Sequence, residues 1–115
     1  MRLTTEIWVS ALVRRVFAAG GFAAVVRRGA AEAGAVFVLA RDRSGEVTLY
    51  GPAAQTMYDT ARPDERLFSQ LEPGGNADAL ERRLEKESRF DPDIWVVEIE
   101  AGGMPVEELI ALRTP

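Results

Sequence analysis

The apolar residues between Thr5 and about Ala19 recur with helical spacing, and Gly20-Gly21 follows as a stop signal. The apolar arc is wide, which is typical of a helix that packs closely on a sheet. Arg15 is the exception, because it lies beside this arc. The members of the arc are Trp8, Val9, Leu12, Val13, Val16 and Phe17.

Alternating apolar and polar positions predict strands over 22–28, 35–41, 46–50 and 94–100. The turn residues at 42–45 predict a hairpin between the second and third strands. The short connection at 29–34 predicts that the first and second strands are also antiparallel neighbours. The pattern at 65–71 fits either a strand or a short helix, and the alternation of its apolar residues favours a strand.

A second helix is predicted over 77–89, with Leu80 and Leu84 as its apolar anchors and charged pairs on its other face. Phe90 is expected to close this helix inward. The strand at 94–100 is apolar on both faces in its first half, which indicates an internal strand. Pro105 can begin a last helix, so 104–115 is expected to be a short C-terminal helix or a frayed tail.

This order of elements predicts an α+β fold, with 1–115 forming a single globular domain. We expect a mostly antiparallel sheet of four to five strands, with the two main helices packed on one face. The expected core anchors are Trp8, Leu12, Val38, Leu84, Phe90, Trp95 and Val97.

The absence of whole residue types excludes several kinds of site. The 115-residue chain has no Cys and no His, so it can form neither disulfides nor the nucleophilic triads that need histidine. No known cofactor-binding or metal-binding loop motif appears, and we expect no catalytic residues, no metal site and no cofactor. Any catalysis would have to use carboxylates, arginine, tyrosine or Lys86, the only lysine among the 14 basic residues.

Charge and hydropathy indicate the class of partner and the cellular location. The net charge of −4 and the isoelectric point near 4.9 make nucleic-acid binding an unfavoured interpretation. The apolar stretch at 7–26 is interrupted by Arg14 and Arg15, whose burial in a bilayer would be costly. The sequence therefore predicts a cytoplasmic protein without a membrane segment.

Four segments together resemble one protein family. They are EIWVSALVRR at 6–15, VVRRGAAEAGAVFV at 25–38, LYGPAAQTMYD at 49–59 and RFDPDIWVVEIE at 89–100. The chain resembles the small alphaproteobacterial proteins of domain-of-unknown-function family 1491. The resemblance implies the fold of those proteins and a bacterial cytoplasmic setting. It implies no activity and carries over no functional residues.

Paired arginines give the clearest candidate site. Arg27 and Arg28 adjoin Gly29, and paired guanidinium groups beside a glycine can bind a phosphate or carboxylate. Glu32 lies nearby in the sequence and is the alternative, purely structural partner for one of them. Arg15 is the third candidate cation. These four residues form the predicted anion-binding or ligand-binding set.

Three classes of function remain open. The favoured one is a protein-interaction or adaptor module, with an unknown protein partner or a second copy in a homodimer; it predicts an exposed apolar patch or an unpaired strand edge. The alternative is a small-molecule or anion-binding domain using Arg15, Arg27 and Arg28, which predicts that their side chains converge. A carboxylate-based enzyme is less favoured and would need clustered acids.

Overall fold

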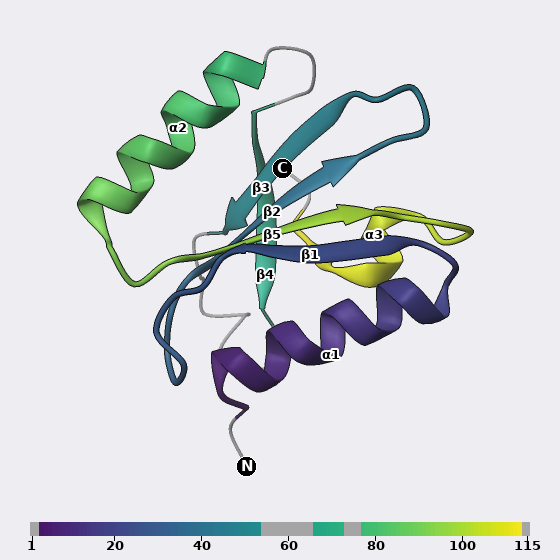
Figure 1. Ribbon diagram of the computed structural model, residues 1–115, viewed down its shortest axis with the longest axis horizontal. Coiled ribbons are helices and arrows are strands. Elements are labelled where there is room, and N and C mark those ends of the chain that lie inside the picture. Colours follow the sequence, from purple (N-terminus) through teal and green to yellow (C-terminus); the bar gives the residue numbers. More distant parts are fainter. Residues whose placement is uncertain (1–2, 54–65, 73–76, 114–115) are drawn as a thin grey trace.

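The computed structural model describes residues 3–53, 66–72 and 77–113. Their helices and strands build an α+β fold around one sheet (Figure 1). The elements are α1 (Thr5–Ala18), β1 (Phe22–Arg27), β2 (Val36–Arg41), β3 (Val47–Pro52), β4 (Leu67–Glu72), α2 (Ala77–Phe90), β5 (Trp95–Glu100), α3 (Val106–Leu109) and β6 (Ala111–Leu112).

The sheet has six strands in the order β1-β5-β2-β3-β4-β6. The pairs β1–β5, β2–β3 and β3–β4 are antiparallel, whereas β2–β5 and β4–β6 are parallel. The expectation of a mostly antiparallel sheet of four to five strands is therefore partly wrong, because the sheet is larger and mixed. The predicted β2–β3 hairpin is confirmed, and the segment that fitted either a strand or a helix forms β4.

The expected pairing of β1 with β2 is wrong, because β5 lies between them. Val97 of β5 pairs with Val25 of β1 on one side and with Val38 of β2 on the other. The first half of β5 is buried on both faces, and a central position gives such a strand two neighbours and cover on each side. The internal position predicted from its apolar run is confirmed.

The core consists of two apolar layers. One layer combines α1 residues such as Leu12 with Val38 and Val97. The other combines Leu80 and Leu84 of α2 with Phe37 of β2 and its pairing partner Val96 of β5. Because neighbouring residues of a strand point to opposite faces, α1 and α2 cover opposite faces of the sheet (Figure 1). The prediction that both helices pack on one face is wrong.

Most of the expected core anchors are buried, but Phe90 is not. Leu12, Val38, Trp95 and Val97 are each at most 1% exposed, and Trp8 and Leu84 are partly buried against the two layers. Phe90 is 91% exposed, so its assignment to the core is wrong. It lies about 120° around α2 from Leu84, outside the apolar face that packs on the sheet.

Candidate functional site

The first turn of α1 is connected to a distant part of the chain through Thr5. Thr4 caps the helix, and its hydroxyl accepts a hydrogen bond from the Ile7 amide at 3.2 Å. The next side chain, Thr5, is completely buried, and its hydroxyl donates to the Gly34 carbonyl at 3.0 Å. The loop before β2 is thereby held against the start of α1.

Arg66, the residue before β4, completes this junction. Its Nη2 donates to Thr5 Oγ1 at 2.5 Å, and its Nη1 donates to the Gly34 carbonyl at 3.4 Å. Its guanidinium carbon lies 5.6 Å from the centre of the Trp8 ring, a distance at which the ring face attracts a cation. Arg66 is thus held by groups from α1 and from the loop before β2.

The Arg66 guanidinium is in an unusual electrostatic environment. Burial lowers its pKa, because removal from water disfavours the charged form. An arginine nevertheless keeps its charge at any physiological pH. Across the part of the chain that the structure describes, no carboxylate forms an ion pair with Arg66. The site therefore has a half-buried positive charge whose partners among the described residues are neutral.

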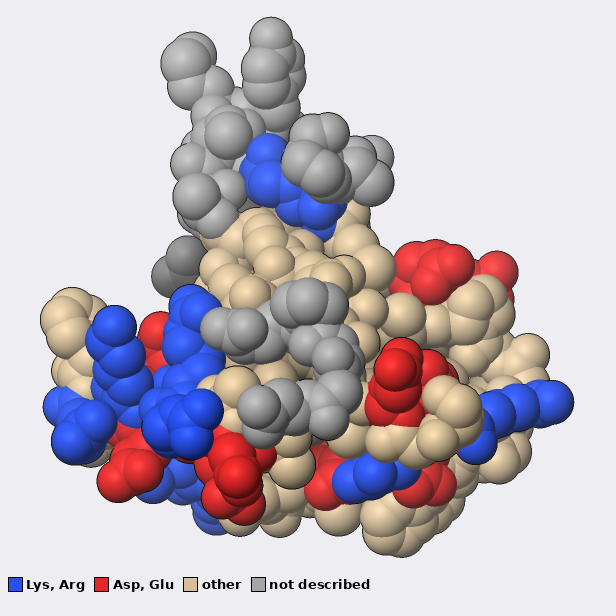
Figure 2. Space-filling model, turned by 90° about the horizontal axis from the view of Figure 1, so that it is seen from above, with Lys and Arg blue, Asp and Glu red and all other residues tan. Residues whose placement is uncertain are grey.

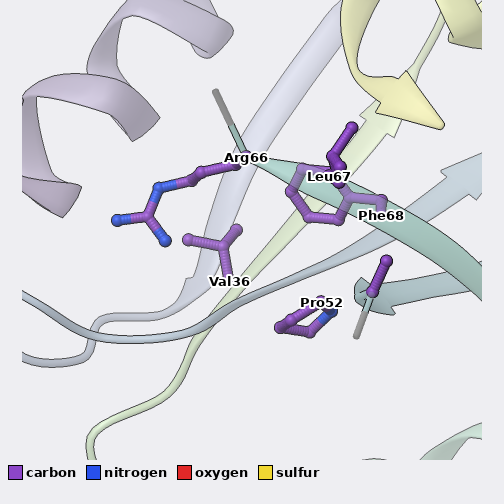
Figure 3. Close-up of a pocket in the computed structure, with 6 residues that line it drawn as sticks. Val36, Pro52, Arg66, Leu67 and Phe68 are labelled. Atoms are coloured by element: carbon purple, nitrogen blue, oxygen red, sulfur yellow. The ribbon is translucent and has the colours of Figure 1, made fainter. Parts of the chain in front are cut away.

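A small pocket adjoins this cation. It has a volume of about 100 Å³ and is lined by Val36, Pro52, Ala53, Arg66, Leu67 and Phe68. Figure 3 shows the Arg66 side chain on one side, above Val36, with Phe68 and Pro52 on the other. Apart from the guanidinium, the labelled lining side chains are apolar. A small pocket with one cation and apolar walls suits an anion that carries a hydrocarbon group.

The candidate cations from the sequence engage different partners. Arg28 Nη2 forms a 2.6 Å ion pair with Glu6, and its guanidinium carbon lies 5.1 Å from the centre of the Trp95 ring. Arg27 donates to the Pro92 carbonyl at 3.0 Å. Arg15 and Glu32 are exposed. The structure thus shows Glu6, not Glu32, as the acid paired with Arg28, and a joint anion site made by these residues remains a prediction.

The sequence did not identify Arg66 as a candidate site residue. It belongs to no motif and stands alone at the start of a segment whose secondary structure was ambiguous. Its partner Thr5 is 61 residues away in the sequence. Only the fold brings the two together, so no local pattern could have identified the pair.

The outer edge of β1 is the second feature of functional interest. β1 pairs with β5 on one side and lies at the end of the strand order, so its other edge has no neighbour among the described strands. Phe22 and Val26 are 51% and 59% exposed, and Val25 is exposed beside them. Phe17 of α1 extends this apolar surface, with its ring centre 5.8 Å from that of Phe22.

The remaining surface offers less specific chemistry. Within 3–53, 66–72 and 77–113, no three acidic side chains gather where they could share a metal ion. None of the described helices combines the length and apolar character that crossing a membrane requires. On the face shown in Figure 2, acidic and basic side chains are interspersed on the left, where α2 lies in Figure 1.

Comparison with known proteins identifies relatives along the whole chain. The model of the family "Protein of unknown function (DUF1491)" matches residues 3–105. The solution structure of protein Atu0922 from A. tumefaciens, a structural genomics target, is 47% identical, with a TM-score of 0.84 over 100% of this chain and 98% of that one. No match is found among curated proteins.

Two structures from a second bacterium are also similar to this chain. A crystal structure of a DUF1491 family protein from Caulobacter crescentus CB15 is 38% identical, with a TM-score of 0.76 over 96% of this chain and 99% of that one. An NMR structure of a DUF1491 family protein from the same strain has the same identity and TM-score, over 99% of each chain. The fold expected from the family resemblance is confirmed, and the chain belongs to the DUF1491 family of proteins of unknown function.

Proposed function

We propose that this protein is a cytoplasmic protein-interaction module that binds an extended segment of a partner along the free edge of β1. One observation carries the proposal. β1 is an edge strand whose exposed side chains, Phe22, Val25 and Val26, are mostly apolar. The apolar surface suits a contact that excludes water, and the open edge suits added backbone hydrogen bonds.

The physics of strand edges supports this use. An edge strand presents N–H and C=O groups that can pair with another extended chain. Proteins commonly protect such edges with lysine, proline or inward-pointing charge. The sequence of β1, FAAVVR, has neither lysine nor proline, and its single charge is at the end. A bulge at Val26, between the paired residues Val25 and Arg27, alters only the last part of the strand.

The charge at that end specifies the partner's chemistry. Arg27 pairs in register with Val96, so it lies on the face of the sheet that α2 covers. Among the described residues, Arg27 donates a hydrogen bond to the neutral Pro92 carbonyl and forms no ion pair. A partner strand with apolar side chains beside Phe22 and Val25, and a carboxylate beside Arg27, complements this edge.

The test uses a short synthetic peptide of alternating valine and threonine with an aspartate near its N-terminus, which antiparallel pairing places beside Arg27. We expect the peptide to shift the amide NMR signals of β1, and an otherwise identical lysine-for-aspartate peptide to bind at least about tenfold more weakly. Absence of any shift in β1, or equal binding of both peptides, would contradict the proposal.

A pair of matched variants locates the binding surface. Val26→Lys puts a charge on the free edge, whereas Ile7→Lys puts the same charge on an exposed aliphatic position of α1. The first should abolish peptide binding and the second should preserve it. Light scattering then measures the mass of the free protein. If the protein is a dimer that Val26→Lys dissociates, a second copy, and not a partner's segment, occupies the edge.

A further inference from the structure

The described residues orient the Arg66 guanidinium but engage only some of its hydrogen-bond donors. A guanidinium has five N–H donors. Two protein acceptors, Thr5 Oγ1 and the Gly34 carbonyl, receive hydrogen bonds from Arg66 in the described part of the chain. These described acceptors therefore leave donor capacity at a group that lines the pocket. An unused donor beside a cavity is a natural position for a ligand's acceptor atom.

The orientation of this cation is fixed before any ligand arrives. The Thr5 hydroxyl gives its proton to Gly34, so its oxygen presents a lone pair to Arg66. The Trp8 ring lies near the guanidinium. A side chain held in this way loses little conformational freedom when it binds an anion, which improves affinity.

The pocket's size and lining restrict what can bind. A cavity of about 150 Å³ accommodates benzene, so one of about 100 Å³ suits a ligand of about four to six non-hydrogen atoms. Val36, Pro52, Leu67 and Phe68 offer apolar contacts to part of that ligand. A bare inorganic anion would leave those walls without a hydrocarbon partner.

We propose that this pocket binds a short-chain aliphatic carboxylate, with the carboxylate on Arg66 and the hydrocarbon chain against Phe68 and Pro52. The proposal concerns a site separate from the β1 edge and does not depend on partner binding there. Carboxylate and guanidinium form charge-assisted, bidentate hydrogen bonds. The competing explanation is that Arg66 serves only to join β4 to α1.

Ligand titrations of the unaltered protein distinguish these explanations. We would titrate propionate, its neutral analogue propionamide, and inorganic phosphate, with sodium chloride holding the ionic strength constant, and follow the amide NMR signals. Propionate should shift the signals of Val36, Ala53, Leu67 and Phe68. Propionamide and phosphate should each bind at least about tenfold more weakly, since each lacks one of the two complementary groups.

Two variants connect any binding to the pocket. Arg66→Gln should weaken propionate binding at least tenfold. Because that change also removes the contact with Thr5, Ala53→Leu serves as the second variant: it narrows the pocket, keeps Arg66, and should weaken binding as much. Arg41→Gln, at a partly buried arginine paired with Glu98, is the control and should bind propionate normally.

Several results would overturn the proposal. Equal binding of propionate and propionamide would show that the ligand's negative charge does not contribute to binding. Equal binding of propionate and phosphate would remove the role of the apolar walls. Shifts that chloride alone reproduces, or no propionate binding by the unaltered protein, would leave Arg66 as a structural residue.

Discussion

Arg66 Nη2 lies 2.5 Å from the hydroxyl oxygen of Thr5, so the residue that leads into β4 is hydrogen-bonded to the first turn of α1. Thr5 is the one polar residue among the fully buried side chains of the described structure. Its position is explained by its two hydrogen bonds, since a buried hydroxyl without partners would be destabilising.

Replacing Thr5 by valine should destabilise the protein. The substitution keeps the side chain's shape but removes the acceptor for Arg66 and the donor to Gly34. Groups left unsatisfied in this way cost about 1–3 kcal/mol of unfolding free energy. Urea denaturation followed by circular dichroism measures the loss. Ser10→Ala, at an exposed position of the same helix, is the control, and an equal effect of both changes would show that the junction contributes nothing.

Trp95→Ala and Phe90→Ala should differ sharply. Trp95 is 1% exposed, and its indole N–H donates to the Ala30 carbonyl at 2.7 Å. Removing its ring should cost about 3–5 kcal/mol and abolish stable folding. Phe90 is almost fully exposed, so its removal should change stability by no more than about 0.5 kcal/mol. Thermal denaturation compares the two, and a Trp95→Ala variant that remains fully folded would show that the residue is not a core anchor.

Gly21→Ala should be far more harmful than Gly103→Ala. A methyl group at residue 21 would overlap the backbone carbonyl oxygen of Glu100 and lie 2.8 Å from the Gly102 amide nitrogen. At residue 103 the nearest atom would be 3.8 Å away, an ordinary contact. The first variant should lose more than about 1 kcal/mol through strain, and the second should stay close to the original stability. Equal melting temperatures for the two variants would contradict the close approach of these backbones.

The contribution of Asp42 to the free energy of unfolding should depend on pH. The hydrogen bond from the Ser44 hydroxyl, together with backbone hydrogen bonds, lowers the pKa of the Asp42 carboxyl below its ordinary value of 3.8. The resulting stabilisation is present above the ordinary pKa and is lost as pH falls through the lowered one. The stability difference between the original protein and Asp42→Ala should therefore be constant near neutrality and shrink in acid. Denaturant titrations between neutral and strongly acidic pH measure it, and a difference that grows in acid would refute the assignment.

Patterns among neighbouring residues were enough to predict the local elements. Helical spacing identified α1 and α2, alternation identified β1, β2, β3 and β5, and the turn after Arg41 identified the hairpin. These features depend on residues close in sequence, whose periodicity reflects which face of an element is buried. The family was also recognisable from four local segments, and the match over residues 3–105 confirms it.

The way in which those elements combine could be read only from the folded chain. The insertion of β5 between β1 and β2, and the placement of α1 and α2 on opposite faces, depend on contacts between distant segments. Periodicity indicates that one face of an element is buried, but it does not indicate which other element covers that face. The same reason explains Phe90, which is exposed at the end of α2, and the Thr5–Arg66 junction, which has no local signal. The candidate pocket exists because the fold joins these separate parts of the chain.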